Sequence, residues 1–204
     1  MNRKAHWEQI YRVQAPHAVS WYQQTPERSL ALIAKTGISR DARIIDVGAG
    51  ASTLVDHLLD AGYRHLAVLD ISAAALEHAR RRLGRRAEGV EWYEADVTEF
   101  RAPRGFDLWH DRAVFHFLTE PAERARYVAV LRRTLKPGAH VIVATFAIGG
   151  PTRCSGLYVV RYDGAMLLRE LGRGFTLQEE VGEVHLTPDG RKQPFTYFRL
   201  SYSP

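Results

Sequence analysis

Cysteine is almost absent from this sequence, and so is any long apolar run. Cys154 is the one cysteine among 204 residues, which excludes an internal disulfide and a thiolate cluster for zinc. No stretch approaches the roughly 20 apolar residues that cross a bilayer. The polar start, residues 1–8, lacks the apolar segment of a secretory signal. We therefore expect a cytoplasmic protein with no membrane partner.

Charge of one sign is only slightly in excess, with 28 lysines and arginines against 23 acids and a net charge of +5. Much of the excess lies at residues 80–82, 85 and 86, around the end of a predicted helix, where cations favour the helix dipole. No basic stripe interleaved with aromatic residues accompanies these arginines. We therefore expect no nucleic-acid partner.

The length of 204 residues suits one well-buried domain better than two. The segment before residue 40 is aromatic and predicts short helices. After it, short apolar runs alternate with amphipathic segments, a pattern that predicts strands separated by helices. The predicted strands cover residues 43–47, 65–70, 90–95, 106–110 and 139–146. This alternation predicts a parallel sheet with helices on both faces.

The C-terminal part breaks the alternation. Two apolar-rich runs, at residues 175–186 and 195–202, flank the turn sequence Pro188-Asp189-Gly190 and predict a β-hairpin. The expected fold class is therefore α/β, with a Rossmann-like, doubly wound, seven-stranded sheet. We expect that sheet to be mostly parallel with an antiparallel C-terminal hairpin, and to belong to a single domain over residues 1–204.

The segment Asp46–Thr53 lies where the first predicted strand meets the helix that follows it. Gly48 and Gly50 allow a tight turn and a close approach of the backbone to a ligand. A dinucleotide would place its pyrophosphate beside these glycines, where Asp46 would repel it. S-Adenosylmethionine (SAM) instead carries an ammonium and a sulfonium, which a carboxylate favours. Because Thr53 also replaces a third glycine, the loop predicts SAM rather than NAD.

Two further acids end the next two predicted strands. Asp70 lies about 20 residues after the glycines, where such folds present a carboxylate to a ribose, and its two oxygens can accept from both hydroxyls. Asp96 ends the third strand, where it can accept from the adenine amino group while Val97 packs on the ring. The carboxyl ends of successive parallel strands meet at one crevice. We therefore expect Asp46, Asp70 and Asp96 to bind one cofactor.

Five segments resemble the successive motifs of class I SAM-dependent methyltransferases: Asp46–Gly50, Leu69–Ser72, Glu94–Val97, Phe106–Ala113 and Leu135–Val143. The terminal hairpin is similar to the last two strands of that fold. The resemblance implies SAM as the cofactor, S-adenosylhomocysteine (SAH) as its product, and a SAM-binding core over residues 41–146. The cofactor-binding residues that it implies in and next to these segments are Asp46, Gly48, Ala49, Gly50, Ser52, Asp70, Ile71, Asp96 and Val97.

A finer resemblance, to thiopurine and small-thiol methyltransferases, rests on the aromatic N-terminus and on three segments: Asp111–Ala113, Phe117–Leu118 and Arg124–Tyr127. It implies a helical lid over residues 1–40, in which Trp7, Tyr11 and Trp21 cover SAM, and it places Arg112 near the methionine end. The segment from Cys154 onward does not match that pattern. Residues 147–204 are expected to form a substrate loop and the hairpin.

Methyl transfer from a sulfonium is an in-line displacement that depends mainly on positioning and on exclusion of water. A base is needed only when the acceptor enters protonated, as a hydroxyl does. His110 and His116 are candidate bases because they flank the end of the fourth predicted strand, although each can equally be a packed structural residue. Asp111 is expected to orient either ring or to pair with Arg112. These four residues are the catalytic candidates, and no metal is expected.

The sequence therefore predicts a SAM-dependent methyltransferase with a small-molecule acceptor, and it favours a thiol or sulfide, with Cys154 a candidate for lining a thiol pocket. A protein-lysine N-methyltransferase of the same fold, or a SAM-binding regulator without transfer activity, stays open. An aromatic lid favours a closed pocket over the open groove that a protein substrate requires. The acceptor atom and the choice between monomer and homodimer also stay open.

Overall fold

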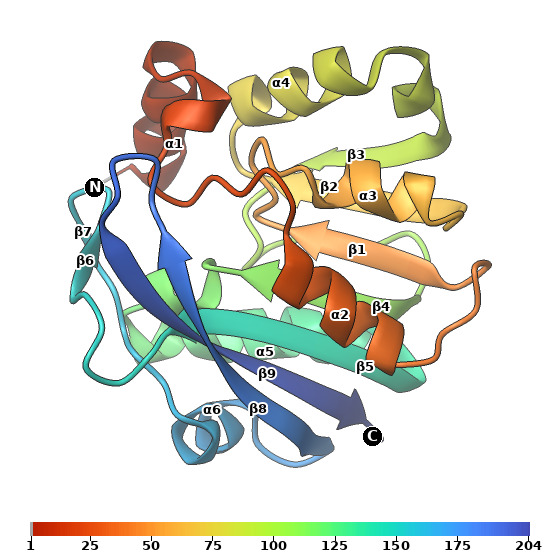
Figure 1. The fold of residues 1–204 in the computed structure, drawn as a ribbon. Helices are drawn as coiled ribbons and strands as arrows, with labels where there is room; N and C mark the ends of the chain where they lie inside the picture. The colour runs from red at the N-terminus through yellow and green to blue at the C-terminus, as the bar shows by residue number, and fades with distance from the viewer. Residues whose placement is uncertain (1) are drawn as a thin grey trace.

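One seven-stranded sheet organises residues 2–204, which the computed structural model describes (Figure 1). Its strand order is β3-β2-β1-β4-β5-β9-β8. Strands β1 to β5 run parallel, and β9 pairs antiparallel with both β5 and β8. This confirms the predicted mostly parallel sheet with its antiparallel hairpin. The strands are β1 (Arg43–Val47), β2 (His65–Asp70), β3 (Val90–Glu94), β4 (Phe106–Arg112), β5 (Leu135–Phe146), β8 (Phe175–Leu186) and β9 (Lys192–Tyr202).

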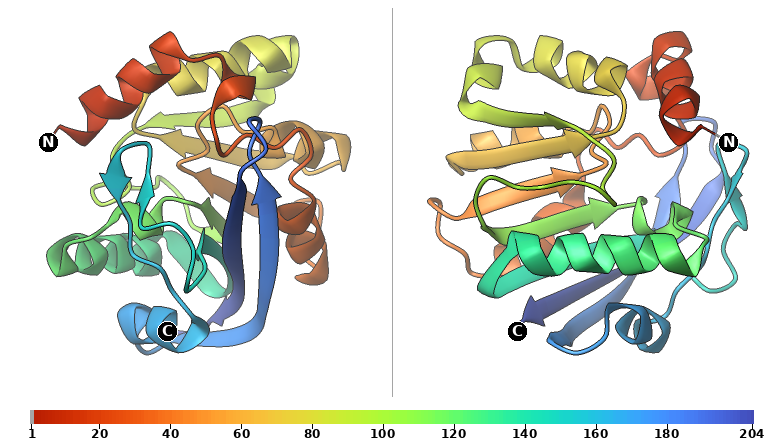
Figure 2. Two further views of the ribbon diagram at one scale, coloured as in Figure 1. Left: turned by 60° about the vertical axis from the view of Figure 1, so that its left-hand side comes forward. Right: turned by 180° about the vertical axis from the view of Figure 1, so that it is seen from behind.

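The central strands are apolar because helices cover both of their faces (Figure 2). Four of the five residues of β1 and five of the six of β2 are buried, as expected of parallel strands that read as near-continuous apolar runs. Within residues 2–204, no helix is long and apolar enough to cross a membrane. The covering helices are α2 (Glu27–Lys35), α3 (Leu54–Asp60) and α4 (Ala73–Leu83) on one face, and α5 (Pro121–Thr134) and α6 (Gly164–Leu171) on the other.

Helix α1 (Arg3–Val13) lies at the edge of the sheet, beside the start of α4 (Figure 1). It begins at Asn2, whose side-chain oxygen accepts a backbone N–H of the first turn at 3.1 Å. Glu8 ties it to α4, because its Oε2 accepts from Ser72 Oγ at 2.7 Å and from Ala74 N at 3.2 Å. A carboxylate is stabilised at a helix N-terminus, so this contact holds α1 beside the carboxyl ends of the strands.

Short elements connect the larger ones. The 3₁₀ helices of the described chain are η1 (Pro16–Ala18), η2 (Gly84–Gly89) and η3 (Phe115–Phe117). A small hairpin that the sequence analysis did not predict joins β6 (Arg153–Cys154) to β7 (Leu157–Tyr158). Its two turn residues, Ser155 and Gly156, have φ of +49° and +78°, the left-handed conformations that two-residue hairpin turns require.

Strand β5 begins four residues earlier than predicted. The sequence predicted that Pro137 and the following glycine would close the preceding helix, and that the strand would begin at Ala139. In the structure α5 ends at Thr134 and β5 begins at Leu135. The pairing with β4 then jumps to His140, so the residues around the proline bulge out of the ladder. A proline has no N–H to donate, and a bulge accommodates it.

Candidate active site

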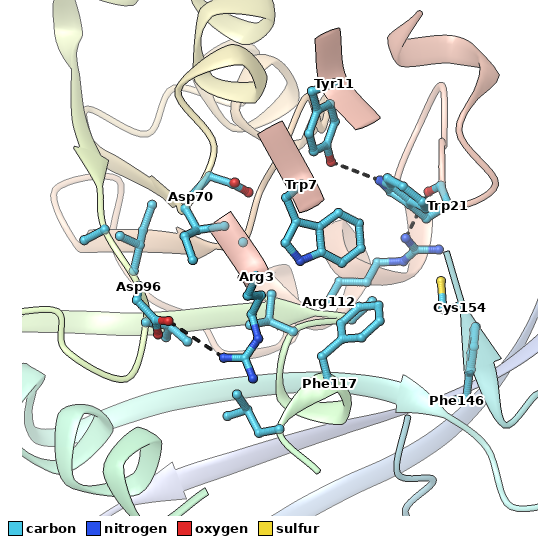
Figure 3. Close-up of a pocket in the computed structure, with 18 of the residues that line it drawn as sticks. Arg3, Trp7, Tyr11, Trp21, Asp70, Asp96, Arg112, Phe117, Phe146 and Cys154 are labelled. Atoms are coloured by element: carbon cyan, nitrogen blue, oxygen red, sulfur yellow. Dashed lines mark hydrogen bonds and ion pairs between the residues drawn. The ribbon is translucent and has the colours of Figure 1, made fainter. Parts of the chain in front are cut away.

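The carboxyl ends of the parallel strands meet along one edge of the sheet, where α1 covers a cavity (Figure 3). This larger cavity has a volume of about 820 Å³ counted to its open mouth, and it runs from Asp96 to Phe146 and Cys154. A smaller cavity of about 530 Å³ adjoins it on the side of Asp46. The residues that line both cavities are Trp21, Gly48 and Arg112.

The glycine loop after β1 depends on left-handed backbone conformations. Gly48 has a φ of +59° and Gly50 a φ of +56°, a region that favours glycine. A Cβ on Gly48 would stand 1.9 Å from Val114 Cγ2, and a Cβ on Gly50 would stand 2.0 Å from the Tyr11 hydroxyl oxygen. Both the turn and the packing therefore require glycine here, and the bare backbone of Gly48 forms part of the wall of both cavities.

Asp70 ends β2 and anchors the glycine loop. One of its carboxylate oxygens accepts from Gly50 N at 2.7 Å, and the other accepts from Ser72 N at 2.8 Å. Burial raises the pKa of Asp70 to about 6, against the effect of these hydrogen bonds, and the charge of Asp46 adds to the rise. A carboxylate has about four lone-pair sites, so two remain for a ligand. Asp70 and the adjacent Ile71 both line the larger cavity.

Asp96 and Val97 line the same cavity after β3. Asp96 Oδ1 accepts from the backbone nitrogen and the hydroxyl of Thr98, both at 2.8 Å. Asp96 Oδ2 lies 3.7 Å from Arg3 Nη1, and Arg3 Nη2 donates to Glu123 Oε1 at 2.6 Å (Figure 3). Arg3 thus ties the start of α1 across this end of the cavity.

Asp46 belongs to a buried hydrogen-bonded chain in the wall of the smaller cavity. Its Oδ1 lies 2.7 Å from His110 Nδ1, and His110 Nε2 lies 2.9 Å from Ser29 Oγ. Asp46 is 5% exposed and His110 is 2% exposed, so both nitrogens of this ring are occupied inside the protein. Ala49 and Ser52 line the smaller cavity beside Asp46.

Four aromatic side chains, two of them from α1, form an aromatic lid over the larger cavity. Trp7 stands edge-on to Trp21 and to Phe117, with ring centroids 5.6 and 5.1 Å apart. Trp21 Nε1 donates to the Tyr11 hydroxyl oxygen at 3.2 Å. All four residues line the cavity (Figure 3). The structure therefore places Trp7, Tyr11 and Trp21 around one cavity together with Phe117, and that the first three cover SAM stays a prediction.

Arg112 lies where the two cavities join, and its guanidinium is only partly paired. Nε donates to the Tyr197 hydroxyl at 2.9 Å, and Nη1 donates to the Trp21 carbonyl oxygen at 3.1 Å. The guanidinium also stacks over the Phe195 ring, 4.6 Å from its centroid. Nη2 is buried without a hydrogen-bond partner, and Arg112 forms no ion pair with any residue from 2 to 204. An unpaired buried donor is costly, so this group is suited to an anionic ligand.

Asp111 does not take either of its predicted roles. It is fully buried, and it neither pairs with Arg112 nor contacts a histidine ring through a hydrogen bond. Its oxygens accept instead from Val114 N at 2.9 Å, Phe115 N at 3.1 Å and the Tyr127 hydroxyl at 2.7 Å. Burial raises its pKa to about 6. Asp111 therefore shapes the turn after β4, because the backbone N–H groups of that turn need an acceptor.

His116 is also fully buried, between the rings of Phe117 and Phe146 at centroid distances of 4.5 and 4.9 Å. Burial, and after it the charge of Arg112, lowers the pKa of His116 to about 3. It lines neither cavity. His110 does line the smaller cavity, but both of its ring nitrogens are engaged by Asp46 and Ser29. Neither ring therefore has a free nitrogen facing the larger cavity, as a general base needs, and the alternative of a packed structural ring fits both.

The arginine cluster at the end of α4 is largely neutralised by α3. Arg82 pairs with Asp56 at 2.7 Å, and Arg86 pairs with Asp60 at 2.7 Å. Arg81 pairs with Glu77 one turn away. These three arginines therefore form ion pairs with neighbouring carboxylates.

The far end of the larger cavity contains residues that sequence reasoning missed. Phe146 and Phe195 read as ordinary strand residues, and they meet only because β5 and β9 pair in antiparallel register. Gln193 comes from the same face of β9 as Phe195. We call this end the acceptor chamber, and its lining residues are Phe117, Phe146, Cys154, Gln193 and Phe195.

Known proteins match this chain most clearly over the segment that contains the glycine loop, Asp70 and Asp96. A family model for a methyltransferase domain matches residues 44–138. Nodulation protein S of Rhizobium tropici is 32% identical over 101 residues, covering 50% of this chain and 42% of that protein. The eEF1A lysine and N-terminal methyltransferase of Danio rerio is 27% identical over 146 residues, covering 70% of this chain and 21% of that protein. The chain thus spans less than half the length of these curated relatives.

Solved structures share the fold over nearly the whole chain. The N-methyltransferase NodS from Bradyrhizobium japonicum WM9, in complex with SAH, has a TM-score of 0.73 at 18% identity and covers 98% of this chain and 100% of its own. A structure described as the conversion of a disulfide bond into a thioacetal group during echinomycin biosynthesis has a TM-score of 0.78 at 18% identity. The match covers 98% of this chain and 93% of that one. Residues 44–138 thus match a methyltransferase domain, and the chain has the fold of SAM-dependent methyltransferases.

SAM is the cofactor of this methyltransferase family, and the side chains present here fit it. The unpaired Nη2 of Arg112 suits the methionine carboxylate. Gly48 presents bare backbone to the cavity, because a Cβ there would clash with Val114. Asp70 keeps lone pairs for ribose hydroxyls, and Asp46 suits an ammonium beside the smaller cavity.

Proposed function

We propose that this methyltransferase transfers the methyl group of SAM to a small-molecule nucleophile. One observation carries the proposal: a single cavity has the carboxylates of Asp70 and Asp96 at one end and the apolar acceptor chamber at the other, under the aromatic lid. Concave sites that are mostly apolar and hold few polar groups are typical of small-molecule binding. A lid of large rings favours such an acceptor over the surface of a folded protein.

In this proposal the adenosine part of SAM occupies the larger cavity beside β2 and β3. The two free sides of the Asp70 carboxylate accept the ribose hydroxyls, next to Ile71. Asp96 accepts from the adenine amino group, and Val97 packs against the ring. Arg3 closes this end through its contact with Asp96.

The methionine part then extends past the glycine loop toward the smaller cavity. Asp46 faces the ammonium, with its carboxylate held in place by His110. Arg112 Nη2 donates to the carboxylate from the junction of the cavities. Ala49 and Ser52 complete the wall on that side.

SAM supplies an electrophilic methyl group, so the chain has to position an acceptor and exclude water. The aromatic lid and Phe146 remove water from the acceptor chamber, where contacts between groups become stronger. Holding two reactants in line can contribute several kcal/mol, roughly 7–11 in well-oriented intramolecular reactions. Asp111 and His116 support the walls of this chamber rather than contacting the acceptor.

The proposal is tested by incubating the purified protein with methyl-labelled SAM and a panel of small thiols, sulfides and amines. We expect label in a small-molecule product together with formation of SAH. The preference for a thiol or sulfide, which rests on sequence alone, stays a prediction that the same panel tests. Tight SAH binding without transfer to any acceptor would instead indicate a SAM-binding regulator.

A second candidate, protein-lysine N-methylation, is favoured by one observation, the 27% identity over 146 residues to the eEF1A lysine and N-terminal methyltransferase. The acceptor chamber opposes it, because no carboxylate among residues 2–204 lines that chamber to receive a lysine ammonium. Labelled SAM mixed with cell lysate separates the two. A labelled protein band favours the second candidate, and label confined to small molecules favours the first.

A further inference from the structure

The acceptor chamber holds very few polar groups, and their identity restricts which acceptor it can methylate. This inference rests on the proposed function, because it assumes that SAM occupies the end of the cavity at Asp70 and Asp96. Opposite that end, beyond Trp7, lie the rings of Phe117 and Phe146 (Figure 3). The ring of Phe195 also lines this part of the cavity. The polar side chains there are Cys154 and Gln193, with Arg112 at the junction.

No side chain of residues 2–204 is placed in this chamber to act as a base. The carboxylates that line the cavity, Asp70 and Asp96, lie at the adenosine end and are already hydrogen-bonded. His116 packs behind Phe117 and Phe146 without lining the cavity. Burial raises the pKa of the Cys154 thiol to about 11. An acceptor that must lose a proton before attack, such as an alcohol or a phenol, therefore finds no group to take it.

No carboxylate of the described chain lines the chamber to receive a cation. The Arg112 guanidinium lies at its edge, stacked on Phe195. After burial, the charge of Arg112 is the second cause of the lowered pKa of both His116 and His185, so its field reaches the surrounding interior. An ammonium brought into this chamber would lose its water without gaining a carboxylate. The acceptor must therefore enter uncharged.

Gln193 is one of the polar residues that line the chamber. Its Oε1 is buried and receives no hydrogen bond from the described residues. Buried polar atoms nearly always have a partner, and an amide oxygen needs an N–H or O–H donor. A thiol S–H is a weak donor by comparison. Because O–H acceptors are excluded by the missing base, an N–H group is the donor that fits.

We infer that the acceptor is a small, uncharged aromatic amine, or a ring nitrogen that carries hydrogen, with its N–H donated to Gln193 Oε1. The nitrogen lone pair forms the new bond to the methyl carbon while the bond from that carbon to sulfur breaks. The electron pair of the broken bond stays on sulfur and gives the neutral thioether SAH. The product leaves the chamber as an ammonium and gives its extra proton to bulk water outside, so no protein base takes part. This inference replaces sulfur with nitrogen as the favoured acceptor atom.

The test uses aniline, thiophenol and phenol, which share one ring and differ in the nucleophilic atom. We expect the wild-type protein to form N-methylaniline and to leave phenol unmethylated at neutral pH. The variant Gln193→Leu should lower kcat/KM for aniline by about tenfold, mostly through KM, because one buried hydrogen bond is lost. Its SAH affinity by calorimetry should match that of the wild type.

The matched control is Gln178→Leu, at an exposed glutamine near the other end of the same hairpin. It should change neither the kcat/KM for aniline nor the SAH affinity. Methylation of phenol as fast as aniline, turnover of thiophenol alone, or an unchanged KM for aniline in Gln193→Leu would each overturn the nitrogen inference while leaving small-molecule methyl transfer intact. Failure of SAH to bind the wild type would instead overturn the proposed function.

Discussion

The two ends of the larger cavity are built from different kinds of sequence information. The cofactor end takes its two acids from the carboxyl ends of neighbouring strands: Asp70 is the last residue of β2, and Asp96 lies two residues after β3. The acceptor chamber takes its lining from residues 117–195, which belong to η3, β5, β6 and β9. The first is acidic and bonded to its own backbone, whereas the second is apolar with one unpaired amide oxygen. The comparison teaches that local turns specify the cofactor end and that long-range strand pairing specifies the acceptor end.

The largest expected effect is that of Gly50→Ala at the cofactor end. A left-handed conformation costs a residue with a Cβ about 1–2 kcal/mol, and the clash with the Tyr11 hydroxyl adds overpacking of about 1–3 kcal/mol. We expect SAH affinity, measured by calorimetry, to fall by about a hundredfold. Gly37→Ala is the matched control, because Gly37 has a φ of +69° but no atom within 4 Å of its added Cβ. Equal SAH affinity in the two variants would show that the packing at Gly50 does not shape the cofactor end.

Asp70→Asn comes next, because it removes the charge while keeping the side-chain size. The glycine loop and the ribose hydroxyls would both lose a charged acceptor, and we expect SAH to bind roughly tenfold to a hundredfold more weakly. Asp60→Asn, at an exposed carboxylate of α3, is the control and should bind like the wild type. An Asp70→Asn protein with wild-type affinity would mean that the ribose lies elsewhere.

The pH dependence of SAH binding tests the role of the Asp70 carboxylate at the cofactor end. Burial raises the pKa of Asp70 to about 6, and binding favours the ionised form. As the pH falls below 6 the carboxylate becomes protonated, so the Kd for SAH should rise by up to about tenfold per pH unit. Asp70→Asn should lose most of this dependence. A flat profile in the wild type would contradict the role given to this carboxylate.

Phe146→Leu should alter only the acceptor end. A change of shape in a packed site costs about 1 kcal/mol, so the KM for the acceptor should rise about fivefold while SAH affinity stays unchanged. Phe175→Leu, at a buried ring that packs on Tyr202 outside both cavities, controls for the loss of stability alone. Parallel losses of SAH and acceptor binding in Phe146→Leu would show that the two ends are not separable.

The smallest effect is expected for Arg3→Ala, which unties α1 from Asp96 and Glu123. Partly exposed ion pairs contribute about 0.2–1 kcal/mol, so SAH should bind up to about fivefold more weakly, with faster release in stopped-flow fluorescence. Lys4→Ala removes the more exposed pair with Glu94 and should change neither value. If both variants release SAH at the wild-type rate, α1 is not a closing element.

Sequence alone predicted the strands of the cofactor end well, because each is a short apolar run that stops at an acid. It also predicted the hairpin, because a proline-aspartate-glycine turn separates two apolar runs. It misplaced the start of β5, since the bulge around Pro137 is decided by pairing with β4. Asp111 was misread for a related reason: its proximity to two histidines in sequence gave no sign that its carboxylate turns toward Tyr127.

The amino-acid order by itself determined the class of fold and the chemistry of the cofactor loop, because turns and strand ends depend on residues that are neighbours in the chain. Only the tertiary structure decided which nitrogen of Arg112 stays unpaired, that His110 and His116 are buried, and that Gln193 and Phe146 line one chamber. Those outcomes depend on pairing between strands about 50 residues apart in sequence, and on burial, which no local pattern encodes.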